Sequence, residues 1–232
     1  LSSGPSVPRA TLRVMADDAP RTPSALDDPT YRTGIVELLG VLAYGEVTAC
    51  YRLVEDAMMA PDLRSTVEVG EMANAEFDHF TKLRDRLVEM GEDPFEAMEP
   101  FRRTFDDFHR KTKPADFLEG LVKAYVGDGL AADFYREVSA YLDPVTRELV
   151  VETMSGTGHS DFVVDAVRSA IEADHRVGGR LALWGRRLMG EALSQAQRLV
   201  AERDALSAVL VGGVDHPGMD LTAIGRMFTR IT

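Results

Sequence analysis

The stretch IVELLGVLAYGEVTACYRL, residues 35–53, carries an apolar stripe with one acidic interruption. The apolar positions recur every three or four residues, which is the spacing of one face of an α-helix; they are Ile35, Leu39, Leu42, Ala49 and Leu53. Glu46 takes the place between Leu42 and Ala49 on that face. The pattern predicts a helix over residues 31–58 that turns a carboxylate toward the protein interior.

A second predicted helix, over residues 61–91, carries two such interruptions. Pro61 suits its first turn and Gly91 its C-terminal stop. Along its apolar stripe, Glu76 and His79 fall one turn apart, between Met72 and Leu83. Because only a few residues separate the two helices, we expect an antiparallel hairpin.

The three interior polar side chains, Glu46, Glu76 and His79, need a common partner. An interior carboxylate costs several kcal/mol unless it is paired, protonated or bound to a cation. A Glu-x-x-His sequence presents a carboxylate and an imidazole to the same point, and two carboxylates with an imidazole suit iron or manganese. A metal-free hydrogen-bonded network with Arg or Tyr partners is the alternative that the sequence leaves open.

The rest of the chain also indicates helices. Pro94 and Pro100 interrupt an irregular stretch that is long enough to cross from one end of a bundle to the other. Further helices are predicted over 115–142, over 144–173 after Asp143 as N-cap, over 176–210 and over 220–231. The predicted fold is all-α: a four-helix bundle with one long crossover between its second and third helices and additional C-terminal helices.

The segments Ala43-Tyr-Gly-Glu46 and Glu76-Phe-Asp-His79 resemble the first half of the ferritin-like di-iron site. The resemblance covers roughly residues 31–173 and is closest to the tRNA isopentenyl-adenosine hydroxylase-like branch, particularly its actinobacterial ferritin-like relatives. It implies a Glu from the third helix and a second Glu-x-x-His from the fourth. It also implies two iron ions and an oxidase or hydroxylase activity that uses oxygen.

The second half of that pattern is incomplete. Gly156-Thr-Gly-His159 takes the second Glu-x-x-His slot, so His159 is kept while its Glu is replaced by glycine. Counting back from this slot places Gly127 where the third-helix Glu is expected. Asp128 and Glu152 lie close to these slots in the sequence. The candidate metal ligands are Glu46, Glu76, His79, His159, Asp128 and Glu152, and the cofactor is one iron ion, two or none.

Composition limits the classes of partner. The net charge of -12 opposes a polyanion, so we expect no tight tRNA binding. A single cysteine, Cys50, excludes an intramolecular disulfide and fits a reducing compartment, so we expect the cytoplasm. The sequence has no run of about 18 apolar residues, so we expect no membrane-spanning segment.

Three regions are predicted: a disordered N-terminal tail over 1–30, a ferritin-like helical bundle over 31–212, and a C-terminal tail with a short helix over 213–232. The leading function is an oxidase or hydroxylase with an incomplete di-iron site. The alternative is a metal-free interaction or scaffold protein that uses residues 176–210 to pack against itself or a helical partner. In either case we expect a homo-oligomer or a helical partner protein.

Overall fold

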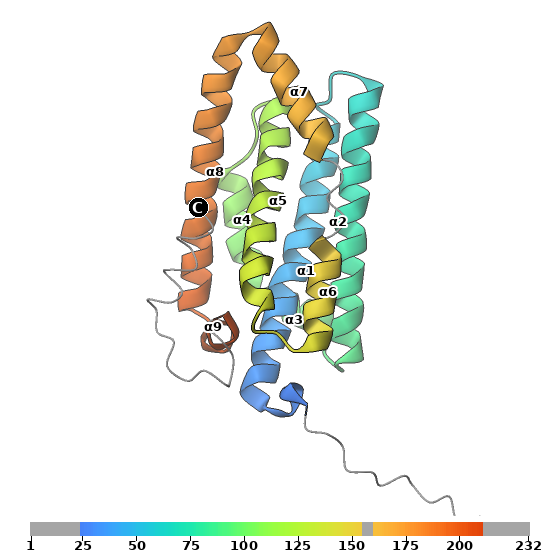
Figure 1. Cartoon of the computed structure of the whole chain (residues 1–232), viewed down its shortest axis with the longest axis vertical. Coiled ribbons are helices and arrows are strands. Elements are labelled where there is room, and N and C mark those ends of the chain that lie inside the picture. The colour runs from blue at the N-terminus through green and yellow to red at the C-terminus, as the bar shows by residue number, and fades with distance from the viewer. Residues whose placement is uncertain (1–23, 155–159, 211–232) are drawn as a thin grey trace, which may run out of the picture.

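The computed structural model describes residues 24–154 and 160–210, whose regular elements are all helical (Figure 1). In chain order these are η1 (Ala25–Asp27), α1 (Pro29–Ala57), α2 (Leu63–Glu89), α3 (Pro94–Met98), η2 (Glu99–Phe101), α4 (Arg102–Lys111), α5 (Phe117–Ser139), α6 (Pro144–Met154), α7 (Ser160–Ala173), α8 (His175–Ala201) and α9 (Asp204–Leu210). The all-α prediction is confirmed. The predicted N-terminal tail is too long by several residues, because η1 and the start of α1 precede residue 31.

Aspartate side chains define where the long helices begin. Asp28 accepts a hydrogen bond from the backbone N–H of Tyr31 at 2.8 Å, and Asp62 does the same for Ser65. The second helix therefore begins at Leu63, and the prediction that Pro61 lies in its first turn is wrong. At the other end of α2, Gly91 has a φ of +79°, the left-handed conformation that commonly terminates a helix.

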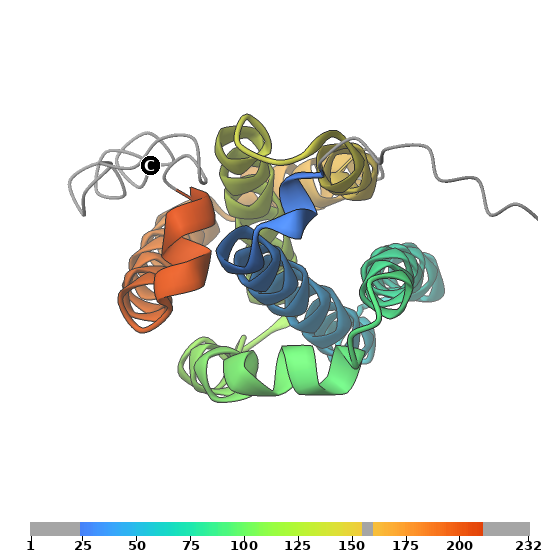
Figure 2. The same cartoon turned by 90° about the horizontal axis from the view of Figure 1, so that it is seen from below.

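Helix α1 is the central element of the bundle. Figure 2 shows it surrounded by α2, α4, α5 and α8, and its most extensive contacts are with the antiparallel α2. It is the one described helix that is long and apolar enough to cross a membrane, but 56% of its most apolar window is buried inside the bundle. Such burial is typical of the core helix of a helical bundle.

The crossover between α2 and α5 is mostly helical, although its sequence pattern is irregular. It consists of α3, η2 and α4, and α4 carries the chain back along the bundle toward the start of α5 (Figure 1). Phe101, in η2, is fully buried and anchors this segment to the core around α1.

The fourth predicted helix is present as two helices, α6 and α7, with residues 155–159 outside the described part of the chain. Asp143 accepts a hydrogen bond from the N–H of Thr146 at 3.1 Å, as expected for the predicted N-cap of α6. The predicted helix over 176–210 is divided into α8 and α9. Glu37 of α1 accepts a hydrogen bond from the N–H of Leu206 and pairs with Arg203, so α1 fixes the start of α9. The helix predicted over 220–231 lies outside the described residues.

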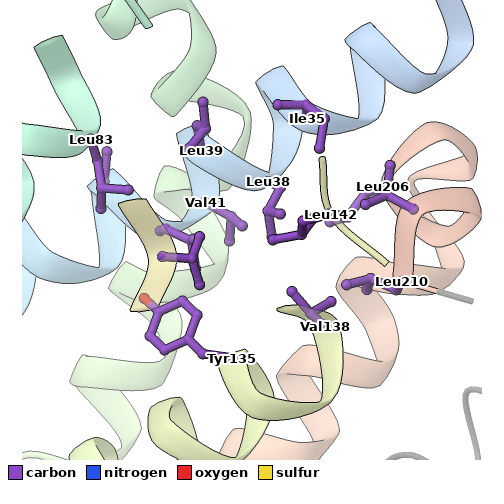
Figure 3. Packing of buried hydrophobic residues seen from close by; sticks show 14 of the residues in the cluster. Ile35, Leu38, Leu39, Val41, Leu83, Tyr135, Val138, Leu142, Leu206 and Leu210 are labelled. Carbon is purple, nitrogen blue, oxygen red and sulfur yellow. The ribbon is translucent and has the colours of Figure 1, made fainter. Parts of the chain in front are cut away.

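Two apolar clusters fill the bundle, and they lie on either side of one polar layer. The larger cluster includes the side chains in Figure 3 and packs around Ile35, Leu39 and Leu83. The smaller one packs around Leu53, Met72 and Leu121. Along α1, Glu46 lies between Ala43 of the first cluster and Cys50 of the second. The apolar stripes predicted on α1 and α2 therefore contribute to both clusters. The polar residues that interrupt these stripes lie between the two clusters.

We predict that Gly40→Ala destabilises the fold by about 1–3 kcal/mol, because the new methyl group would overlap the backbone carbonyl of Ala97. Gly70→Ala is the matched control, since no atom lies within 4 Å of that position on α2. This second substitution should stabilise the fold by about 0.5–1 kcal/mol through helix propensity. Urea unfolding followed by circular dichroism measures both. Equal stabilities of the two variants would contradict the close approach of α1 and α3.

Candidate metal centre

Two neighbouring helices bring Glu46, Glu76 and His79 to one point. The Nδ1 atom of His79 lies 3.5 Å from a carboxylate oxygen of Glu46 and 3.9 Å from one of Glu76. One ligand atom from each of the three residues lies within 4.8 Å of the other two. Their side chains are only 11–16% exposed. Spacing of three residues on α2 places Glu76 and His79 on the same face, opposite Glu46 of α1.

Two of these groups hold their protons more tightly than usual. The pKa of Glu76 is raised to about 8, mainly by burial and also by the nearby Glu46 carboxylate. Hydrogen bonding to Glu46 and Glu76 raises the pKa of His79 to about 9. In the described part of the chain, no Lys or Arg side chain pairs with either carboxylate. The site is therefore a place where a bound cation would replace protons.

Helix α5 contributes Tyr135 to the same layer. Its hydroxyl donates a hydrogen bond to Glu46 at 3.0 Å, and burial raises the pKa of the phenol well above its ordinary value. The phenol stays protonated and can only donate to Glu46. This hydrogen bond fixes the position of one Glu46 oxygen and leaves the other facing His79. Sequence reasoning did not assign Tyr135 this position, because nothing in the spacing pairs α5 with α1 at this level.

Asp128 of α5 also faces the cluster. The pKa of Asp128 is raised to about 7, mainly by burial and also by the negative charge of Glu76, against a smaller lowering by His79. At the neighbouring Gly127, no atom of residues 24–154 or 160–210 lies within 4 Å of the place where a side chain would begin. A glycine in place of the expected Glu could reflect either close helix packing or open space at this position. Among the described residues, the structure has open space there.

Two sequence candidates are not part of this cluster as described. Glu152 points away from it: its side chain is 60% exposed and forms an ion pair with Lys82 at 2.8 Å. The expectation that Glu152 reaches into the site is therefore wrong, because α6 places this residue on the outer face beside α2. His159 and Gly156, the predicted second Glu-x-x-His slot, lie outside the described residues.

A cavity of about 370 Å³ opens beside the cluster, between α1, α4, α5 and α8. Its lining is mostly apolar, with Phe105, Phe134 and Leu188 among the larger contributors, and it includes Glu46, Glu76, His79 and Asp128. This volume is within the range of small-molecule sites. The metal candidate thus lies on the wall of a space that could hold an organic molecule.

Three further polar groups line the cavity toward the C-terminal end of α1: Asp56, His109 and Lys123. Sequence reasoning missed them as site residues. For Asp56 a signal existed, since it continues the α1 stripe in steps of three and four beyond Ala49 and Leu53. For His109 and Lys123 the sequence offered no comparable signal. How α4 and α5 pack against α1 could not be predicted from the sequence of the crossover.

Glu46, Glu76 and His79 could hold one divalent cation, through two carboxylates and one neutral imidazole nitrogen. Asp128 lines the same cavity and would supply a third negative charge. Two Fe²⁺ ions would bring four positive charges into a buried layer. The open space at Gly127, where a further carboxylate is absent, agrees with a smaller charge capacity.

The comparisons place the chain in a known fold family. A family model described as the ferritin-like domain of actinomycetes matches residues 29–213. A solved structure of a Synechococcus protein with aldehyde deformylating oxidase activity has a TM-score of 0.66 at 18% identity, and the alignment covers 87% of each chain. At that identity the likeness shows the fold alone. No curated protein matches the sequence. The match over most of the chain shows that this protein belongs to the actinomycete ferritin-like domain family.

Proposed function

We propose that this protein binds one iron(II) ion through Glu46, Glu76, His79 and Asp128 and uses it to oxidise an apolar substrate held in the adjoining cavity. One observation carries the proposal: a buried cluster of metal-ligand side chains without a fixed counter-ion forms part of the wall of an apolar cavity. The ferritin-like fold, and the aldehyde deformylating oxidase activity of the Synechococcus protein with a similar structure, agree with it.

The chain's own residues have separable roles in this proposal. Bound iron would supply one-electron redox chemistry with dioxygen as the oxidant. Tyr135 orients the Glu46 carboxylate through its hydrogen bond. Asp128, whose raised pKa of about 7 belongs to the metal-free site, would lose its proton when iron binds. Apolar side chains of α4, α5 and α8 shield the cavity from water and retain an apolar substrate.

The tRNA isopentenyl-adenosine hydroxylase-like assignment remains a prediction that nothing in the described structure tests. We propose that tRNA is not the substrate, because the net charge of -12 opposes binding of a polyanion. An apolar cavity is also a poor environment for a phosphate backbone. Self-association and a cytoplasmic location likewise remain predictions.

The alternative function is a metal-free interaction or scaffold protein. The residues first expected to form its interface are largely used within the chain: α8 buries Leu181, Trp184 and Leu188. Trp184 also donates a hydrogen bond to the Glu119 carbonyl of α5. Exposed apolar side chains gather instead near the turn between α1 and α2, where Met58 and Leu63 are 83% and 79% exposed. Any docking by this route would therefore use the α1–α2 turn rather than α8.

Metal content distinguishes the two functions. After anaerobic loading with Fe²⁺ and desalting, we expect about one iron per chain, because the carboxylates present do not neutralise two ions. Glu76→Gln should weaken iron binding by at least about tenfold, since it removes a charged ligand. Glu71→Gln, an exposed position on the same helix, should retain iron. Elemental analysis measures each protein, and a wild-type chain without iron would favour the scaffold function.

Metal binding should also remove the pH dependence of stability that these groups cause. Without metal, His79 has a raised pKa of about 9, so its stabilising contribution is lost as the pH rises through that value. The raised pKa of Glu76, about 8, acts in the same direction, because ionisation of the buried carboxylate is unfavourable. We expect the Tm of the metal-free protein to fall from about pH 7 to about pH 9.

With a divalent ion bound, the ligands are deprotonated in the folded protein, as they already are in the unfolded chain above about pH 7, so the Tm should change little over the same interval. Differential scanning calorimetry with EDTA and with Mn²⁺ measures both curves. Mn²⁺ is used because it has similar ligand preferences to Fe²⁺ and does not oxidise in air. Parallel curves with and without Mn²⁺ would show that these residues do not bind the ion.

A further inference from the structure

The end of the cavity beyond the metal candidate contains two buried groups of opposite charge that do not touch. Asp56 of α1 and Lys123 of α5 are 5% and 8% exposed and both line the cavity. Each affects the electrostatics of the other, yet no ion pair joins them within the described part of the chain. A buried pair of this kind is stabilised only when its remaining hydrogen-bonding capacity is satisfied.

Both groups have hydrogen-bonding capacity left over. Lys123 donates one hydrogen bond, to the Thr112 carbonyl at 2.9 Å, and has two further N–H donors. The Asp56 carboxylate accepts no hydrogen bond from any described residue. It lies against the backbone of α5 at Gly120, where an added methyl group would come within 3.0 Å of it. The missing side chain at Gly120 is therefore what allows Asp56 to face the cavity beside α5.

His109 of α4 adds an unused acceptor nearby. Thr48 donates its single hydroxyl proton to backbone carbonyls of its own helix, so the contact at 3.3 Å requires the Nε2 atom of His109 to carry a proton and donate to Thr48. Burial lowers the pKa of His109 to about 3, which keeps the ring neutral. Its Nδ1 atom is then an unprotonated acceptor, and it is buried without a partner among the described residues.

The charge balance selects the kind of group that would fit here. Burial raises the pKa of Asp56 to about 6 and lowers that of Lys123 to about 8, so at pH 7 both are mainly ionised and their charges cancel. Arg52 also lines the cavity and pairs with Glu55 at 2.8 Å, so these two charges cancel as well. A carboxylate ligand would be repelled by Asp56, and an ammonium ligand by Lys123. A neutral hydroxyl group both accepts and donates a hydrogen bond. It can therefore accept one from the free N–H donors of Lys123 and donate one to the Asp56 carboxylate.

We propose that the cavity end between Asp56 and Lys123 is a binding subsite for the hydroxyl head group of an otherwise apolar molecule. The hydroxyl oxygen accepts a hydrogen bond from Lys123, and its proton is donated to Asp56. The apolar body then continues along the cavity past Leu53 and Leu188. This subsite involves none of the proposed metal ligands, so it stands or fails independently of iron binding.

The test uses the full-length chain in EDTA and two isomers of equal size, 1-octanol and heptyl methyl ether. Both can accept a hydrogen bond from Lys123, but only the alcohol can donate one. We expect 1-octanol to bind at least about tenfold more tightly by isothermal titration calorimetry, because a hydrogen bond to a charged acceptor is lost in the ether. Octanoate and octylammonium should each bind more weakly than 1-octanol.

Asp56→Ala should bind the alcohol and the ether with equal affinity. Its matched control is Glu55→Ala, which removes the neighbouring, exposed carboxylate and should keep the preference for the alcohol. The wild-type comparison decides the question even where Asp56→Ala does not fold. Equal binding of the two isomers by the wild type, no binding of 1-octanol, or an unchanged preference in a folded Asp56→Ala protein would each overturn the proposal.

Discussion

The constraint on which this structure depends is the burial of two carboxylates and an imidazole between two apolar cores. Glu46, Glu76 and His79 are largely shielded from bulk water, and no Lys or Arg within the described residues pairs with them. They are kept inside by the apolar residues above and below them on α1 and α2, which are fully buried. The free energy gained by burying those cores offsets the cost of burying the polar layer. The negative charge of that layer can be balanced only by protons or by a bound cation.

The helices outside the four-helix arrangement determine what the polar layer adjoins. In the described part of the chain, α4 and α8 are placed so that they enclose a cavity with α1 and α5, rather than filling it. Ion pairs hold these outer helices: Lys111 of α4 pairs with Glu191 of α8, and Arg180 of α8 pairs with Asp116 and Glu119 at the start of α5. The packing of α8 through Trp184 adds a buried contact to these surface links. Because α4 and α8 enclose the cavity, the layer of polar residues forms part of the cavity wall.

The sequence predicted the parts of this structure that depend on local periodicity. Helical spacing identified the interior faces of α1 and α2 and the places of Glu46, Glu76 and His79, because a polar residue within an apolar stripe is visible in one helix at a time. It could not predict the hydrogen bond from Tyr135, the exposed position of Glu152 or the approach of α4 to Thr48. These depend on the rotation of one helix against another, which is set by tertiary packing. The glycine at 127 was identified, but only the structure distinguishes open space from close contact.

The cavity connects two polar clusters that differ in kind. Glu46 and Asp56 lie ten residues apart on α1, which is about 15 Å along the helix axis. The cluster around Glu46 is acidic and, among the described residues, only protonation of His79 provides a positive charge there, whereas the pair of Asp56 and Lys123 is already balanced in charge. The first is therefore suited to a cation and the second to a neutral polar group, with apolar side chains between them. A molecule whose hydroxyl lies at Asp56 would present a carbon well along its chain, rather than its head group, to the carboxylate layer. If iron binds there, oxidation would occur at a position of the substrate remote from its polar end.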